Sequence, residues 1–132
     1  GITINTATLT LENGGYIGAD TSGKGNAGNI AIRATEGVNV GGVLSSGVFD
    51  TGEGNSGGIT INTATLTLEN GGIITAITSG KGNAGNIAIK STERVTVLGG
   101  LSSGVTATGE GDSGGITIDT STLTLENGGY IG

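Results

Sequence analysis

The residues that could do chemistry in this chain are limited to carboxylates, a few cationic side chains and hydroxyl groups. The sequence contains no His and no Cys, so it lacks an imidazole base, a thiolate nucleophile and the soft ligands of zinc and haem sites. Three glutamates, Glu12, Glu69 and Glu126, each follow a leucine and precede Asn-Gly-Gly. Glycosidases use paired carboxylates, but the acid and the base need different surroundings. Because these glutamates share one setting, we interpret them as a solvent-exposed row and predict that the chain is not an enzyme.

Composition and charge narrow the class of protein further. The net charge of −6 argues against a nucleic-acid partner and against binding to an anionic membrane surface. The apolar runs are too short for membrane insertion. The chain has 30 Gly and no Pro, whereas collagen combines periodic Gly with abundant Pro. Since Gly1 is not a natural initiator and no signal sequence opens the chain, we expect an interior piece of a longer protein.

The elements that carry these residues are set by an internal repeat. The sequence repeats with a period of 57 residues, as units 1–57 and 58–114 and a partial unit 115–132, which we treat as one domain in a longer array. Each unit contains two half-repeats of 28 and 29 residues, and one extra residue in the first corner accounts for the difference. Each half-repeat starts at the first of two alternating isoleucines, namely Ile2, Ile30, Ile59, Ile87 and Ile116.

Short strands are predicted within each half-repeat. Residues 2–5 and 8–11 alternate apolar and polar side chains, which is typical of β-strands, and a third segment runs through Ile17 and Ala19. Identical half-repeats bury their apolar residues by parallel stacking. We therefore predict an all-β fold, a parallel β-helix or β-solenoid with about 28–29 residues and three short strands per coil. The isoleucines above form an inward ladder, and we expect most glycines at the coil corners.

Two polar columns are predicted in the glycine-rich corner. The first carries Asn26, Asn55, Asn83 and Asp112, which we interpret as an amide ladder that forms hydrogen bonds along the axis. Calcium binding at Asp112 is a weak alternative, because the calcium-binding nonapeptide repeats Asp every nine residues. We therefore predict no cofactor. The second column alternates charge as Lys24, Glu53, Lys81 and Glu110, which favours ion pairs between successive coils and fixes the register.

Two further surface features have alternative interpretations. Thr8-Leu9-Thr10 recurs at 65–67 and 122–124, as in ice-binding threonine arrays, but the intervening coils interrupt the rows. Tyr16 and Tyr130 share one phase of the repeat with Ile73 between them, and Phe49 is the remaining aromatic residue. We interpret these aromatics as exposed side chains that either contact glycans or neighbouring filaments or serve no site.

A family resemblance is carried by three strings: Gly-Asn-Ala-Gly-Asn-Ile-Ala-Ile, Gly-Asn-Ser-Gly-Gly-Ile-Thr-Ile-Asn-Thr and Leu-Thr-Leu-Glu-Asn-Gly-Gly. Across the whole chain they resemble the repeat arrays of large cyanobacterial exoproteins of the filamentous-haemagglutinin type, which are similar to two-partner-secretion adhesins. The resemblance implies a right-handed β-helix shaft, an extracellular or cell-surface location and a role in adhesion, aggregation or filament formation. It implies no catalytic residues.

We therefore expect a structural or adhesive extracellular shaft that associates with itself by coil stacking or lateral contact. Surface glycans are further candidate partners. A carbohydrate-active β-helix enzyme, such as a polysaccharide lyase or hydrolase, is the main alternative, and an ice-binding protein is another. The enzyme requires clustered, non-repeating charged residues on one face, whereas the charged positions of this chain are repeated or solitary.

Overall fold

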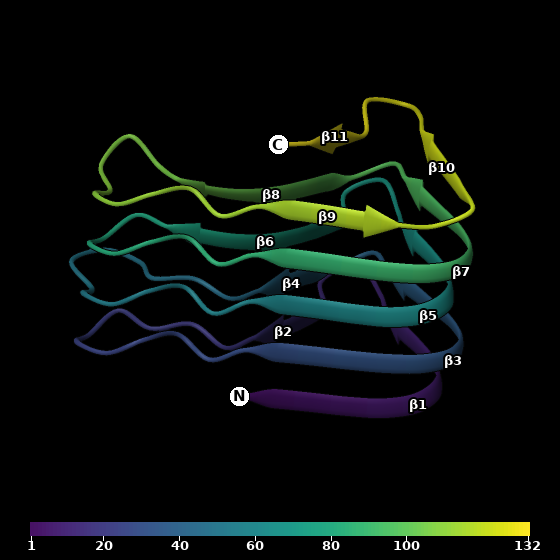
Figure 1. The fold of residues 1–132 in the computed structure, drawn as a ribbon, viewed down its shortest axis with the longest axis horizontal. Coiled ribbons are helices and arrows are strands. Elements are labelled where there is room, and N and C mark those ends of the chain that lie inside the picture. Colours follow the sequence, from purple (N-terminus) through teal and green to yellow (C-terminus); the bar gives the residue numbers. More distant parts are fainter.

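Alternating β-branched and leucine-rich segments form two parallel sheets, which wind through five coils in a computed structural model that describes residues 1–132. The near strands run one way and the far strands return as the chain rises, which makes the solenoid right-handed (Figure 1). The first sheet contains β1 (Ile2–Leu11), β3 (Ile30–Val40), β5 (Ile59–Leu68), β7 (Ile87–Val97), β9 (Ile116–Asp119) and β10 (Thr122–Leu125). The second contains β2 (Tyr16–Gly18), β4 (Val43–Ser45), β6 (Ile73–Thr78), β8 (Gly100–Val105) and β11 (Tyr130–Ile131).

Identical residues stack in register from coil to coil, as the repeat predicts. Ile30 pairs with Ile2 below it and with Ile59 above it, and the column continues through Ile87 to Ile116. Parallel pairing of this kind satisfies the backbone between neighbouring coils and leaves the strand side chains to alternate between the interior and the outer face. The predicted isoleucine ladder and the parallel β-solenoid are therefore confirmed.

The interior is a narrow aliphatic column. The inner coils bury their isoleucines, valines and leucines almost completely, with Ile59, Ile61 and Ile87 at 0% exposure. Each such side chain contributes about 1.5–3 kcal/mol by burial. The same positions in the last coil are open, so that Leu123 and Leu125 are about half exposed, at 49% and 51%.

The prediction of three short strands per coil needs one refinement. In the first four coils, the first two predicted segments form one long strand that bends at a register shift, for example between Thr6 and Thr8. Only the last coil separates them, as β9 and β10. The glycine-rich corner after the second sheet has isolated parallel bridges in place of a strand, including Lys24 to Glu53.

Alternate coils differ from each other by three local changes in length. The bend gains one residue, since Ala7 alone lies between the paired positions of β1 whereas Thr35 and Glu36 lie between those of β3. The turn from the first sheet to the second comprises residues 12–15 in the first coil but only residues 41–42 in the second coil. The corner that follows the second sheet comprises residues 22–23 in the first coil but residues 49–52 in the second coil, between the bridges Thr21 to Val48 and Lys24 to Glu53. The last two changes cancel in length, so only the first is visible in the half-repeat spacing.

No helix in the structure is long and apolar enough to span a membrane.

Candidate functional site

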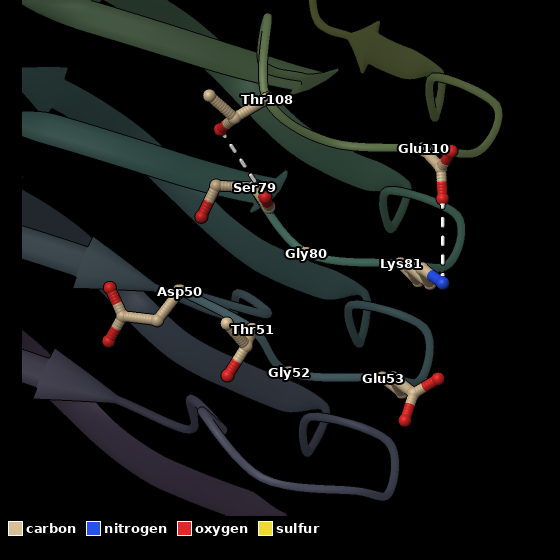
Figure 2. A pocket seen from close by; sticks show the side chains of 9 residues that line it. All are labelled: Asp50, Thr51, Gly52, Glu53, Ser79, Gly80, Lys81, Thr108 and Glu110. Atoms are coloured by element: carbon tan, nitrogen blue, oxygen red, sulfur yellow. Dashed lines mark hydrogen bonds and ion pairs between the residues drawn. The ribbon is translucent and has the colours of Figure 1, made fainter.

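The lengthened corners create a groove on the side of the solenoid. Loops 49–52 and 106–109 protrude from the second and fourth coils, and each is closed by a turn in which the glycine N–H donates to a carbonyl, Gly52 to Phe49 and Gly109 to Thr106. The third coil has the short corner and forms the floor. The resulting groove has a volume of about 410 Å³. No hydrophobic residue lines it, and the lining consists of Asp50, Thr51, Gly52, Glu53, Ser79, Gly80, Lys81, Thr108 and Glu110 (Figure 2).

The groove combines carboxylates, one ammonium group and hydroxyl groups. Lys81 Nζ lies 3.9 Å from Glu110 Oε2, and Thr108 Oγ1 donates to the Ser79 carbonyl at 3.4 Å (Figure 2). Asp50 adopts a positive φ of 57° at the tip of its loop, a conformation in which Asp is more common than most non-glycine residues. This arrangement can form hydrogen bonds with a polar ligand, but it holds no hydroxyl nucleophile hydrogen-bonded to a carboxylate base.

The alternating charge column lies along one edge of this groove. Its four residues form consecutive parallel bridges, Lys24 to Glu53, Glu53 to Lys81 and Lys81 to Glu110. Ion pairs at 3.9 Å join Lys24 to Glu53 and Lys81 to Glu110. The predicted pairing is therefore present at two of the three steps. Because these side chains are largely exposed, each pair contributes under about 1 kcal/mol.

The amide column also lies where the repeat places it. The side-chain Oδ1 of Asn26 accepts the backbone N–H of Asn55 at 2.9 Å, and Asn55 and Asn83 do the same for Asn83 and Asp112. The ladder thus joins side chains to the next backbone. Asp112 belongs to this column, and no group of three or more His, Cys, Asp or Glu side chains gathers around it or elsewhere in the chain.

A second asparagine ladder escapes sequence analysis. Asn29 Oδ1 accepts the N–H of Gly58 at 2.8 Å, and Asn86 Oδ1 accepts the N–H of Gly115 at 2.7 Å. Gly58 and Gly115 occupy the same column but have no side chain to continue it. The signal available in the sequence was the alternation of Asn and Gly directly before the first isoleucine of each coil.

The glutamates of the turns and the outward threonines lie at the coil positions that the repeat predicts. Glu12, Glu69 and Glu126 lie on alternate coils, with Gly41 and Leu98 between them. One outward threonine row, starting at Thr8, continues as Gly37, Thr65, Arg94 and Thr122. The glycine and the arginine interrupt it, so no flat threonine lattice forms on this sheet.

A carboxylate clamp forms at Asp20, a residue that sequence analysis did not single out. Asp20 Oδ1 accepts hydrogen bonds from Ser45 Oγ at 2.8 Å and from the Gly47 N–H at 2.7 Å, while Oδ2 accepts one from the Tyr16 hydroxyl. The hydrogen bond to Asp20, and secondarily burial, raises the pKa of Tyr16 above its ordinary value. The three donors account for both oxygens of Asp20, which therefore joins the first coil to the second.

The chain matches no model of a known protein family, no curated protein and no solved structure. The functional argument therefore depends on the fold and on the geometry of the surface.

Proposed function

We propose that this chain is a segment of an extracellular structural or adhesive shaft, built from stacked β-solenoid coils and without enzymatic activity. The observation that carries the proposal is the continuity of the axial columns. The isoleucine, asparagine and charge columns each continue through four or five coils. A structure in which every coil repeats the contacts of its neighbours is a stiff rod, and its length increases by about 4.8 Å per coil.

The surface also favours a scaffold over an enzyme. The loops that flank the polar groove recur with the repeat, because loops 49–52 and 106–109 both protrude and the two-coil period separates them by about 9.6 Å. The two loops share Thr-Gly at their ends, Thr51-Gly52 and Thr108-Gly109, so these groups are displayed at a fixed spacing. A polysaccharide lyase or hydrolase requires one asymmetric constellation, in which the acid and the base differ in their surroundings. The resemblance to filamentous-haemagglutinin-type exoproteins agrees with the scaffold and with a location at the cell surface.

The rod can be tested by extending the chain in register. Residues 115–132 restart the repeat, so residues 1–114 joined head to tail once, twice and three times keep the coil phase. We expect small-angle X-ray scattering to give a constant cross-section and a maximum dimension that grows by about 19 Å per added copy, which is four coils. A maximum dimension that does not grow with copy number would contradict the rod.

The location and the lack of activity need separate measurements. An antibody against the chain should label intact cells that make the protein, and labelling only after permeabilisation would contradict the extracellular proposal. Incubation with acidic polysaccharides, with and without calcium, should release no products. Turnover that is lost in a Glu53→Gln or Glu110→Gln variant would instead assign an enzyme to the groove.

A further inference from the structure

Three asparagines in the turns between the two sheets are followed directly by glycine. They are Asn13, Asn70 and Asn127, and every other asparagine of the chain precedes a residue with a side chain. Each Asn-Gly step forms the middle of a four-residue turn that one hydrogen bond closes, for example from the Gly15 N–H to the Glu12 carbonyl at 2.8 Å. Because the turns follow the two-coil period, the three steps lie on the first, third and fifth coils.

The middle of each turn has no counterpart on the neighbouring coil. The turn of residues 12–15 is two residues longer than the turn of residues 41–42, and Val43 N–H bonds to the Gly15 carbonyl while Gly41 N–H bonds to the Leu11 carbonyl. Asn13 and Gly14 are therefore the extra residues, and they protrude from the stack. The turn of residues 69–72 has the same relation to residues 41–42 and 98–99.

The reactive groups of the Asn-Gly steps are consequently free and accessible. The N–H groups of Gly14, Gly71 and Gly128 donate to no backbone carbonyl. The three asparagines and the glycines that follow them are all exposed. A Cβ on any of these glycines would meet nothing within 4 Å apart from its chain neighbours. Water can therefore reach both the side-chain amide and the adjoining peptide group.

The asparagines of the two ladders have the opposite setting. Asn55 Oδ1 accepts the Asn83 N–H, and the next N–H along the chain, that of Ser56, donates to the Asn83 carbonyl at 2.8 Å. The other ladder asparagines are held in the same way, namely Asn26, Asn29, Asn83 and Asn86. Both the side chain and the following N–H are thus bound to the next coil.

We propose that Asn13, Asn70 and Asn127 are sites of spontaneous deamidation, with water as the co-reactant. Asparagine is one of the chemically labile side chains. The nitrogen of the following glycine attacks Cγ of the asparagine, so that an N–Cγ bond forms and the Cγ–Nδ2 bond breaks. The amide nitrogen leaves as ammonia together with the proton of the glycine N–H, and a five-membered succinimide ring remains. Glycine favours this step, because it has no Cβ to crowd the ring and adopts the widest range of backbone conformations.

Water then opens the ring at one of its two carbonyl carbons. Opening at Cγ leaves aspartate, whereas opening at the main-chain carbonyl carbon leaves isoaspartate, in which the chain runs through Cβ and Cγ. Either product carries one new negative charge, so three events add three negative charges to a chain of net charge −6. Each new carboxylate lies next to a turn glutamate, Glu12, Glu69 or Glu126. Deamidation therefore concentrates negative charge along one edge of the solenoid, at intervals of about 9.6 Å.

Tryptic mapping of the intact chain tests the sites against an internal control. After incubation at mildly alkaline pH, cleavage at Lys and Arg gives fragments 1–24, 34–81 and 95–132, each with one Asn-Gly step, and fragments 25–33 and 82–90, in which every asparagine belongs to a ladder. We expect mass spectrometry to show deamidated forms that increase with time in the first three fragments and no change in the other two. Fragment-ion spectra should place the change at Asn13, Asn70 and Asn127, and an isoaspartyl methyltransferase should methylate the same three fragments.

A triple variant, Asn13→Gln with Asn70→Gln and Asn127→Gln, is the matched control. Glutamine keeps a neutral amide but needs a six-membered ring, so the isoelectric point of the variant should stay constant while that of the wild-type chain falls. A synthetic peptide of residues 64–76 sets the length of the incubation. Fragments 1–24, 34–81 and 95–132 that stay unchanged when this peptide is fully deamidated would overturn the proposal, as would equal deamidation of fragments 25–33 and 82–90. Neither result bears on the scattering test of the rod, because the chemistry of the turns does not depend on the proposed shaft.

Discussion

The side-chain Oδ1 of Asn55 accepts a hydrogen bond at 2.9 Å from the backbone N–H of Asn83, which lies one coil further along the axis. The side chain therefore supplies an acceptor between two backbone hydrogen bonds that join the same coils, Gly54 N–H to Lys81 O and Ser56 N–H to Asn83 O. Because Asn26 bonds in the same way to Asn55, side chains as well as backbone hydrogen bonds connect this corner from coil to coil.

Removal of this side chain should have a modest and specific cost. Asn55→Ala leaves the Asn83 N–H without its acceptor, and we expect a loss of about 1 kcal/mol of unfolding free energy, measured by urea denaturation. Asn55→Asp keeps the oxygen and should lose less, as Asp112 occupies the same column. The control is Asn39→Ala, because the Asn39 side chain lies exposed on a strand and makes no hydrogen bond. Equal losses in Asn55→Ala and Asn39→Ala would contradict the ladder.

The contrast between the inner and outer coils gives a second prediction. Ile61 is 0% exposed in the third coil, and Ile61→Ala should cost about 2–5 kcal/mol by loss of burial and creation of a cavity. Ile118 continues the same column in the last coil but is only partly buried. Ile118→Ala should therefore cost less than half as much. Equal costs in chemical denaturation would show that the coils do not differ in packing.

These columns were predictable from the sequence, and the groove was not. An equivalent of Ile59 starts every coil, and an equivalent of Asn55 lies four residues before the start of each coil after the first. Parallel stacking therefore places the members of each set next to one another. The turn at residues 41–42 and the loop at residues 49–52 change length in opposite directions, so the half-repeat spacing hides both. Asp20 escaped for another reason: its column holds no second carboxylate, and a clamp that occurs once gives no repeat signal.

The hydrogen bond between Tyr16 and Asp20 predicts a loss of stability at alkaline pH. The folded state raises the pKa of Tyr16, whereas the unfolded chain returns it to about 10. The contribution of Tyr16 is therefore complete below about pH 10 and is lost as the pH rises through the folded pKa. Tyr16→Phe cannot ionise, so the difference in unfolding free energy between wild type and Tyr16→Phe should shrink above about pH 10. Tyr130→Phe is the control and should keep the wild-type pH dependence, since its hydroxyl contacts no carboxylate.

The stacking of glycines at one corner gives the sharpest test of the solenoid. Gly28, Gly57, Gly85 and Gly114 lie above one another, and a Cβ on Gly57 would fall within 3.0 Å of the Gly28 carbonyl oxygen. Because that neighbour is backbone, Gly57→Ala must separate two coils, and we expect a loss of about 1–3 kcal/mol. Gly100→Ala meets open space at a φ that other residues adopt, and it should be neutral or stabilising by about 0.4–1 kcal/mol, because alanine restricts the unfolded chain. Thermal denaturation of the two variants beside wild type separates them, and a stable Gly57→Ala would mean that the coils are not stacked as closely as the structure places them.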